Sequence, residues 1–203
     1  LGVLSHYSYL LASRGEAILV DPARDVERYL KDAQELGVTI KYVYLTHSHA
    51  DFVAGHMEML NAVTGLTIVV NEDTKAGYPH TPAGEGFEIR VGDIRGVVVK
   101  TPGHTPDGTC LYIHAPAAAA GPRLVLTGDT LFIGSVGRPD LLGENMTAAS
   151  LAGMACDSWN NKLAKLADDV KIFPAHGAGS LCGAHLSDKP VSTIGEQKQD
   201  NPY

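Results

Sequence analysis

The sequence predicts a mixed α/β fold, and three observations support this fold class. Short runs of β-branched and aromatic residues alternate with segments whose apolar residues recur at helical spacing. The chain has 203 residues, which suits one large domain or two small ones. No internal repeat and no low-complexity linker divides the sequence. We therefore expect a single domain over residues 1–203, with helices on the outer faces of its strands.

The first part of the chain predicts a hairpin followed by a helix. Residues 7–11 and 17–20 are typical of strands, and residues 13–15 form the turn between them. Residues 25–36 carry apolar side chains at helical spacing, and Gly37 follows as a stop signal.

The middle and end of the chain predict more strands and two further helices. Strands are expected at residues 42–45, 67–70, 87–89, 96–100, 109–114, 124–126 and 170–173. Residues 52–62 and 147–166 have helical patterns. Residues 71–86 are rich in Gly, Pro and Thr, which predicts a loop. Residues 116–122 predict a hairpin tip, and a long Gly-rich segment follows the last strand.

Composition excludes several classes of partner. The net charge is −7 without a basic block, so we expect no nucleic-acid binding and no binding to anionic membranes. No apolar run approaches the ~18 residues of a membrane helix. The three cysteines are widely spaced and form no CxxC pair, which favours a reducing, cytoplasmic location. The chain starts at Leu1 rather than Met, so we expect a start that is processed, trimmed or missing a disordered segment, and a lost targeting peptide stays open.

Four short clusters of His, Asp and Gly each follow an apolar, strand-like run. They contain, in chain order, His47 with His49 and Asp51, then His104, then Asp129, and finally His176. Because strand ends can converge at one edge of a sheet, we expect these side chains to lie close together. Imidazole and carboxylate ligands suit Zn, Fe and Mn. The sequence therefore predicts a metal site.

The order of these residues resembles that of the metallo-β-lactamase superfamily. The His-x-His-x-Asp motif, the later His, the bridging-type Asp and the last His occur in the family's order. The resemblance covers residues 7–202 and implies an αββα sandwich with the metal at the edge of two sheets. It also implies that the chain starts just short of the family's first strand.

One position departs from the superfamily pattern. The usual motif continues with a further His, which helps to hold a second metal, whereas this chain has Phe52. A benzyl ring has no lone pair to donate, so a dinuclear hydrolase centre is not expected. A mononuclear site of two His and one carboxylate with open positions favours Fe(II) and oxygen chemistry.

Four further segments resemble persulfide dioxygenases, also called sulfur dioxygenases. These are residues 50–56, 128–132, 137–140 and 192–195. Phe52 and the loop 176–183 are most similar to the branch fused to rhodanese domains. The resemblance implies oxidation of a low-molecular-weight persulfide, such as glutathione persulfide, by O2 to sulfite and the thiol. It also implies a rhodanese domain in cis or in trans, and we expect a homo-oligomer.

The resemblance also implies roles for individual residues. It places the iron ligands on His47, His104 and Asp129, with one Fe(II) per chain, for which Zn or Mn can substitute after expression. It gives His49, Asp51 and His176 catalytic roles around the bound ion, where they orient ligands or bind water. The alternative that His49 also binds metal, as in zinc hydrolases, stays open.

Two further residues are predicted to bind substrate. Arg138 matches the family's Gly-Arg-x-Asp element, and its guanidinium can pair with a glutathione carboxylate or the persulfide sulfurs. The alternative is a structural ion pair with Asp140 or a helix end. Cys182 follows His176 in a Gly-rich loop and can meet the substrate sulfur or carry a persulfide. Its alternative is a passive loop thiol.

Two rival functions remain from the sequence. The first is a glyoxalase II-like hydrolase acting on a hydroxyacylglutathione thioester, which shares the fold and the order of His and Asp. Phe52 argues against it, because that chemistry usually uses two metals. The second is a non-catalytic sulfur-carrier module in which Cys182 matters more than metal. The intact His47, His104 and Asp129 argue against this module.

Overall fold

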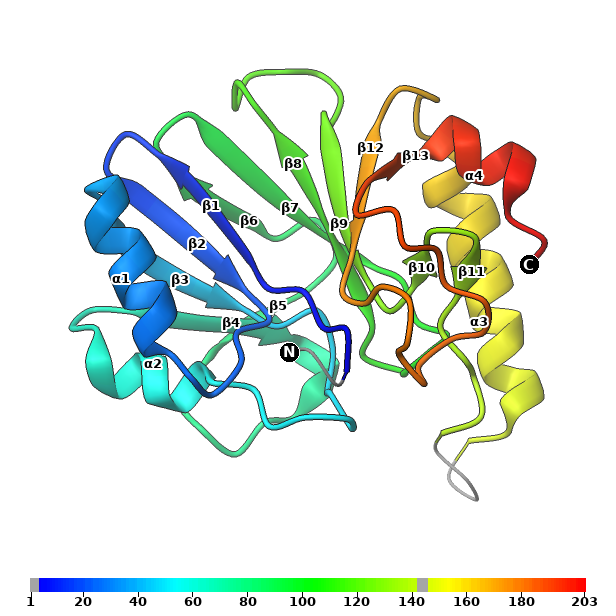
Figure 1. Ribbon diagram of the computed structural model, residues 1–203, viewed down its shortest axis with the longest axis horizontal. Helices are drawn as coiled ribbons and strands as arrows, with labels where there is room; N and C mark the ends of the chain where they lie inside the picture. The colour runs from blue at the N-terminus through cyan, green and yellow to red at the C-terminus, as the bar shows by residue number, and fades with distance from the viewer. Residues whose placement is uncertain (1–3, 142–145) are drawn as a thin grey trace.

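The computed structural model describes residues 4–141 and 146–203 and shows a four-layered αββα sandwich. Two β-sheets pack face to face (Figure 1). Helices α1 and α2 cover the outer face of one sheet, and α3 and α4 lie on the outer side of the other (Figure 1). The predicted αββα sandwich is confirmed. None of the helices within the described residues is long and apolar enough to cross a membrane.

The first sheet has five strands in the order β1-β2-β3-β4-β5. Its strands are β1 (Tyr9–Ser13), β2 (Glu16–Val20), β3 (Thr39–Tyr44), β4 (Thr67–Asn71) and β5 (Thr81–Ala83). The predicted hairpin is confirmed, because β1 and β2 pair antiparallel around the turn. Strands β2 to β5 run parallel, so their carboxyl ends lie at one edge of the sheet.

The second sheet has six strands in the order β13-β12-β9-β8-β7-β6. Its strands are β6 (Glu88–Val91), β7 (Ile94–Lys100), β8 (Thr109–His114), β9 (Leu124–Gly128), β12 (Lys171–Pro174) and β13 (Ser192–Thr193). A separate hairpin pairs β10 (Leu131–Phe132) with β11 (Ser135–Val136). Strands β7, β9 and β12 run in the same direction, so their carboxyl ends also meet at one edge.

Within residues 4–141 and 146–203, four helices and two short 3-10 turns accompany the sheets. They are α1 (Glu27–Leu36), α2 (His56–Ala62), η1 (Glu72–Thr74), α3 (Ala148–Asn161), η3 (Leu163–Lys165) and α4 (Ile194–Asp200). Helix α1 stops where the sequence predicts, because Gly37 adopts a left-handed φ of 64° that glycine accepts without strain. Thr147 and Thr193 cap α3 and α4 with their side-chain oxygens.

The main core lies between the two sheets. Apolar side chains from both inner faces are fully buried there, among them Ile18, Tyr44, Val69, Val98 and Leu111. Burying each such side chain stabilises the fold by about 1.5–3 kcal/mol relative to exposure, before conformational entropy is counted. The outer faces of the sheets form two further clusters against the helices.

The two sheets are also joined by polar contacts at the edge where their carboxyl ends meet. The Tyr44 hydroxyl lies 2.5 Å from Thr109 Oγ1. Thr109 donates from its backbone N–H and its hydroxyl to the Thr46 carbonyl, at 2.9 and 2.7 Å. All these groups are buried, so the contacts fix the end of β3 against the start of β8.

Several elements differ from those that the sequence predicts. The helix expected at residues 52–62 begins at His56, because Gly55 donates to the Pro22 carbonyl and Ala54 bridges to Ala23. The helix expected at residues 147–166 ends at Asn161 and is followed by η3. These ends are set by tertiary contacts and cap geometry rather than by periodicity.

Three short strand pairings and one helix were not predicted from the sequence. Strand β5 lies inside the expected loop 71–86, and its Pro82 is tolerated because the strand is at the edge of the sheet. Strands β10, β11 and β13 have two residues each, which is too short for a detectable alternation of side chains. Helix α4 has only seven residues and lies in the segment after the last expected strand.

Candidate metal centre

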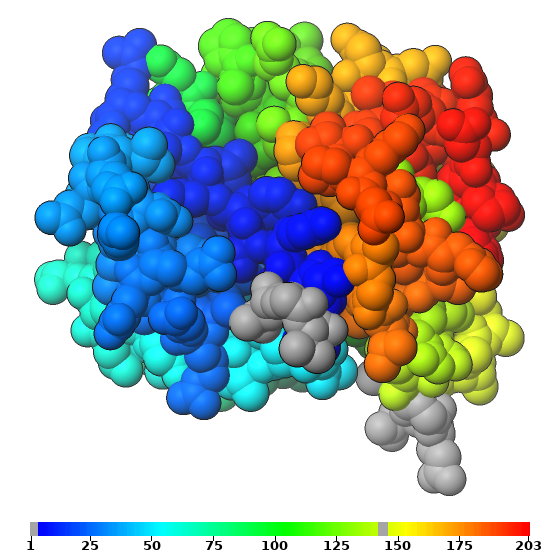
Figure 2. Space-filling model, viewed as in Figure 1, coloured from blue at the N-terminus to red at the C-terminus, as the bar shows by residue number. Residues whose placement is uncertain are grey.

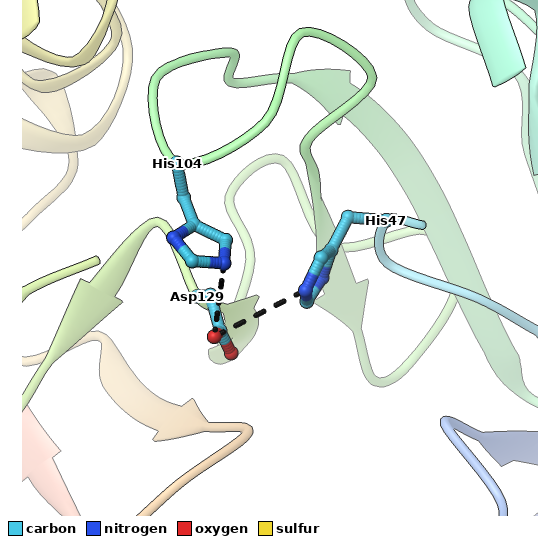
Figure 3. Close-up of side chains that lie close together, drawn as sticks. All are labelled: His47, His104 and Asp129. Atoms are coloured by element: carbon cyan, nitrogen blue, oxygen red, sulfur yellow. Dashed lines mark ion pairs between the residues drawn. The ribbon is translucent and has the colours of Figure 1, made fainter. Parts of the chain in front are cut away.

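Three predicted metal ligands meet at the edge where the strands end. His47 follows β3, His104 follows β7, and Asp129 follows β9. One ligand atom from each lies within 4.8 Å of the other two, and all three residues are buried. The Nε2 atoms of His47 and His104 lie 4.0 and 3.4 Å from Asp129 Oδ2 (Figure 3). We call His47, His104 and Asp129 the histidine cluster.

Asp129 is a buried carboxylate that lacks hydrogen bonds. Its relative exposure is 2%, and neither carboxylate oxygen has a hydrogen-bond partner within residues 4–141 and 146–203. Burial raises its pKa above the ordinary value. A buried charge is costly unless it is paired or binds a cation. The donor set and the unsatisfied oxygens therefore fit a metal ion at this position.

Hydrogen bonds leave the Nε2 lone pairs of both histidines available for a metal. His104 Nδ1 lies 2.9 Å from the Arg138 carbonyl, which can only accept, so Nδ1 carries the proton. His47 Nδ1 lies 2.9 Å from Thr46 Oγ1, whose own proton is donated to Asp21 Oδ2 at 2.8 Å. His47 therefore also donates from Nδ1, as metal-binding histidines usually do.

The protonation of His47 suits the same role. Burial, followed by the nearby imidazoles of His49, His104 and His176, lowers its pKa well below the ordinary value. The ring is therefore neutral at physiological pH, which is the form that binds metal.

His49 lies next to the histidine cluster but is not part of it. Its Nε2 lies 3.0 Å from Asp21 Oδ1, and its ring packs against Phe52 with centroids 4.4 Å apart. Burial disfavours the charged ring, but the carboxylate of Asp21 outweighs this effect and raises the pKa of His49. The arrangement agrees with an orienting role for His49, and its Nδ1 remains without a hydrogen bond among the described residues.

Asp21 is a residue of this site that the sequence analysis did not identify. It is buried next to the loop that carries the His-x-His-x-Asp motif, residues 47–51. It accepts hydrogen bonds from the backbone N–H and the hydroxyl of Thr46. Burial opposes ionisation, but His49 and these hydrogen bonds keep its pKa below the ordinary value. Its only signal in the sequence is its place after strand β2, at the same edge as the other clusters.

The remaining predicted residues form a second group on the other side of Asp129. Asp51, His176 and Cys182 bring one ligand atom each within 4.8 Å of one another. His176 Nε2 lies 3.3 Å from Asp51 Oδ2 and 3.6 Å from Asp129 Oδ1. We call Asp51, His176 and Cys182 the thiol cluster. The structure thus brings seven of the eight predicted site residues to one place, with His49 between the clusters.

Cys182 is a buried, protonated thiol in this arrangement. Burial and the charge of Asp129 raise its pKa to about 12. Its carbonyl accepts from the N–H of Arg138 at 2.8 Å, and its N–H donates to Ser180 Oγ at 3.1 Å. The thiol is therefore held toward the carboxylates rather than exposed as a loop side chain.

The side chain of Arg138, the eighth predicted residue, is paired on the surface. Its guanidinium donates to both oxygens of Asp140 at 2.6 and 2.8 Å, which is the alternative that the sequence left open. Its backbone is nevertheless part of the site, because the carbonyl accepts from His104 and the N–H donates to Cys182. A contact between the guanidinium and substrate stays a prediction.

Asp107 is another residue that the sequence analysis missed. Its Oδ2 accepts from the N–H and hydroxyl of Ser48 at 3.1 and 2.6 Å and from Thr74 Oγ1 at 2.9 Å. Its carbonyl accepts from Asn71 Nδ2. Asp107 therefore links the loop that carries Ser48 to the end of β4 and to η1.

Two glycines allow the backbone to approach the histidine cluster closely. A Cβ on Gly137 would lie 2.0 Å from the Asp129 carbonyl oxygen and 2.8 Å from the His104 Cβ. Gly128 has a φ of 51°, and a Cβ there would lie 2.8 Å from Thr46 Oγ1. A Cβ at Gly137 would press on two ligands and one at Gly128 on Thr46, so glycine is favoured at both positions.

A cavity lies against the histidine side of the site. Its volume is about 260 Å³, and its lining includes His47, His49, Phe52, Val53 and Tyr78. The lining combines aromatic rings with a few polar groups, as small-molecule sites usually do.

Comparisons with known sequences agree with this geometry. The sequence profile of the metallo-beta-lactamase superfamily matches residues 1–176. The mitochondrial persulfide dioxygenase ETHE1 of Mus musculus is 31% identical over 201 residues, covering 97% of this chain and 70% of the mouse protein. The mitochondrial hydroxyacylglutathione hydrolase of Saccharomyces cerevisiae is 29% identical over 206 residues, covering 96% of this chain and 69% of the yeast protein.

A solved structure has the same fold at higher identity. The crystal structure of a metallo-beta-lactamase from Staphylococcus aureus superposes with a TM-score of 0.88 at 35% identity. The match covers 98% of this chain and 60% of that one, so this chain spans less than two thirds of its length. The profile match, the shared fold and the clustered His and Asp side chains together show that this chain belongs to the metallo-beta-lactamase superfamily.

Proposed function

We propose that this chain is an Fe(II)-dependent persulfide dioxygenase that oxidises a low-molecular-weight thiol persulfide. The observation that carries the proposal is the composition of the histidine cluster. Two imidazoles and one carboxylate come together, while His49 is held by Asp21 outside the cluster. Two His and one carboxylate with open positions is the ligand set of non-haem Fe(II) oxygenases. The similarity to the mouse persulfide dioxygenase supports the same reaction.

The proposed reaction converts R–S–SH, O2 and water into R–SH, sulfite and two protons. The terminal sulfur is oxidised and O2 is reduced, so no other oxidant is needed. Iron(II) held by His47, His104 and Asp129 would supply the redox chemistry that lets O2 react with sulfur. The site also places both reactants close together, which lowers the entropic barrier.

The surrounding side chains orient the ligands and handle protons. Thr46 Oγ1 accepts from Nδ1 of His47, and the Arg138 carbonyl accepts from Nδ1 of His104. These contacts hold the two imidazole rings in place. Asp51 Oδ2 has no hydrogen-bond partner in the part of the chain that the structure describes, so it can accept the proton that the persulfide loses. We propose that the thiol carrier of the persulfide lies in the cavity beside Phe52 and Tyr78.

The second candidate is a thioester hydrolase that acts on hydroxyacylglutathione. The yeast relative supports it at nearly the same identity as the mouse dioxygenase. The free Nδ1 of His49 is the structural observation in its favour, because a third imidazole on the ion would match a hydrolytic zinc site. Phe52 is the observation against it.

The deciding experiment measures O2 consumption and sulfite together. The full chain is loaded anaerobically with Fe(II), and glutathione persulfide is added in air-saturated buffer. We expect one sulfite to form for each O2 consumed. His104→Ala should show neither O2 consumption nor sulfite formation. A parallel assay follows hydrolysis of a hydroxyacylglutathione by the zinc-loaded chain.

The two assays separate the candidates. O2 consumption without thioester hydrolysis supports the dioxygenase. Thioester hydrolysis without O2 consumption, at full iron occupancy in the first assay, replaces the proposal with the hydrolase.

A further inference from the structure

A second cavity lies on the outer side of the second sheet, between α3, the β10–β11 hairpin and the segment after α4. Its volume is about 480 Å³, and its lining includes Leu131, Val136, Trp159 and Asn201. Figure 1 shows α3 (yellow) beside the hairpin, and Figure 2 shows α3 and the chain end (red) on the side of the molecule opposite α1 and α2. Small-molecule sites have volumes of roughly 300–1,000 Å³. We call this space the α3 cavity.

The helix leaves room for the α3 cavity because it turns mostly small side chains toward it. Ala152, Ala155, Cys156 and Trp159 line the cavity and recur at the spacing of one helix face. The two alanines carry only methyl groups, whereas Trp159 supplies a broad apolar ring. This wall of the cavity therefore offers space together with one large apolar surface.

The lining of the α3 cavity carries no charged side chain. Within residues 4–141 and 146–203, no Asp, Glu, Lys, Arg or His lines it, whereas Pro139 and Leu163 add to its apolar surface. A charged ligand would lose its hydration there without gaining a charged partner. The lining therefore favours an uncharged, apolar ligand.

Two polar side chains of the lining are already bonded within the protein. Asn201 Nδ2 donates to the Ser135 carbonyl at 3.0 Å, and Thr130 Oγ1 donates to the Thr101 carbonyl at 3.2 Å. Asn160 is exposed at the cavity, and its amide oxygen can accept from a ligand. The cavity therefore suits an apolar body that bears one hydroxyl or N–H group.

The walls of the α3 cavity also contact the loop that carries His104. A Cβ on Gly103 would lie 2.6 Å from the Cβ of Ala155, so α3 packs directly on this loop. Ser158 Oγ, on the same helix, donates to the Pro102 carbonyl at 2.8 Å. Because protein interiors are closely packed, a change in the position of α3 would be transmitted to His104.

We propose that the α3 cavity is a second binding site, which takes an uncharged, apolar small molecule with one hydroxyl or N–H group. The bound molecule holds α3 against the loop of His104 and thereby tightens metal binding at the histidine cluster. Coupling between two sites is reciprocal, so a bound metal tightens the small molecule by the same factor. This inference does not rest on the proposed reaction.

The test uses Trp159 as a reporter, because it is the single tryptophan of the sequence and lines the cavity. The chain loaded with Zn²⁺ is titrated with 1-decanol, which has an apolar body and one hydroxyl. We expect the emission to move to shorter wavelength and to saturate at one decanol per chain. Decanoate has the same carbon chain with a charged end, and it should bind more than about tenfold more weakly.

Two modified chains locate the bound decanol. Ala152→Leu fills the cavity from α3 and should abolish the response, whereas Ala149→Leu is the matched control at an exposed position of the same helix. If Ala152→Leu does not fold, alkylation of the exposed Cys156 with N-ethylmaleimide blocks the same cavity in the unchanged chain, since Cys110 and Cys182 are buried. Binding that persists in whichever of these chains is folded overturns the proposal.

Competition with a chromophoric chelator measures the link to the metal. Saturating decanol should tighten Zn²⁺ binding at least about fivefold, the lower end of the usual coupling between sites. Unchanged Zn²⁺ affinity contradicts the link, and equal binding of decanol and decanoate contradicts the uncharged site. Emission that depends on protein concentration without decanol means that a second copy covers the cavity, which also contradicts the proposal. No turnover is measured, so these results leave the O2 assay unaffected.

Discussion

The histidine cluster and the thiol cluster meet at Asp129 but are built in different ways. Asp129 directly follows β9, and His47 and His104 lie within four residues of the ends of β3 and β7, so the strands set the positions of these ligands. In the thiol cluster only His176 follows a strand, whereas Asp51 and Cys182 lie in loops. Loops tolerate change more readily than strands do. The comparison indicates that the strands position the histidine cluster, whereas the packing of loops positions the thiol cluster.

Removing the shared carboxylate should have the largest effect. Asp129→Asn keeps the size of the side chain but removes the charge that faces both clusters. We expect loss of the metal at the histidine cluster and of O2 consumption. The fall in metal affinity should exceed the ~100-fold change that residues outside the ligand set produce. Metal analysis of the purified variant checks this. Asp93→Asn, at a surface ion pair with Arg14, is the control and should retain full metal content.

Gly137→Ala should disturb the histidine cluster next most strongly. The added Cβ would meet the Asp129 carbonyl at 2.0 Å and the His104 Cβ at 2.8 Å. We expect a loss of about 1–3 kcal/mol in the free energy of unfolding, with weaker Fe(II) binding. Gly153→Ala in α3 has open space around its Cβ and should be neutral or stabilising. Equal denaturant midpoints for the two variants would show that the close approach at Gly137 is unimportant.

Thr46→Val should weaken metal binding at the histidine cluster. It removes the hydroxyl that accepts from His47 Nδ1 and donates to Asp21, and it leaves the thiol cluster untouched. We expect Fe(II) affinity to fall about 10–100-fold. Competition with a chromophoric chelator measures this change. An unchanged Fe(II) affinity would mean that the contact between Thr46 and His47 does not orient the ring.

Arg138→Gln should have the smallest effect on stability. The Arg138–Asp140 pair is 46% and 48% exposed, and exposed pairs contribute less than about 1 kcal/mol. The backbone contacts of residue 138 to both clusters remain, so metal content should not change. If the guanidinium binds substrate, KM for glutathione persulfide should rise while kcat stays constant. An unchanged KM would leave Arg138 with a purely structural role.

The sequence by itself determined the fold class, most of the strands and the residues of the centre. These features depend on local pattern: apolar periodicity marks the strands, and His, Asp and Gly directly after a strand mark the site edge. Phe52 was also informative from the sequence alone, because a phenyl ring cannot replace the metal-binding His of the usual motif, whatever the coordinates are. The short strands β5 and β13 were missed because two or three residues carry too little periodicity.

Only the tertiary structure decided how the centre is divided. The Nδ1 partners of His104 and His176 are backbone carbonyls 34 and 172 residues away in the chain. Backbone carbonyls are the same in every residue, so no sequence pattern marks them. The pairing of His49 with Asp21 and the place of Cys182 beside Asp51 likewise depend on how separate loops pack. The sequence therefore predicted which residues gather at the site. Packing decided which nitrogen of each histidine is hydrogen-bonded and which is left to bind a ligand.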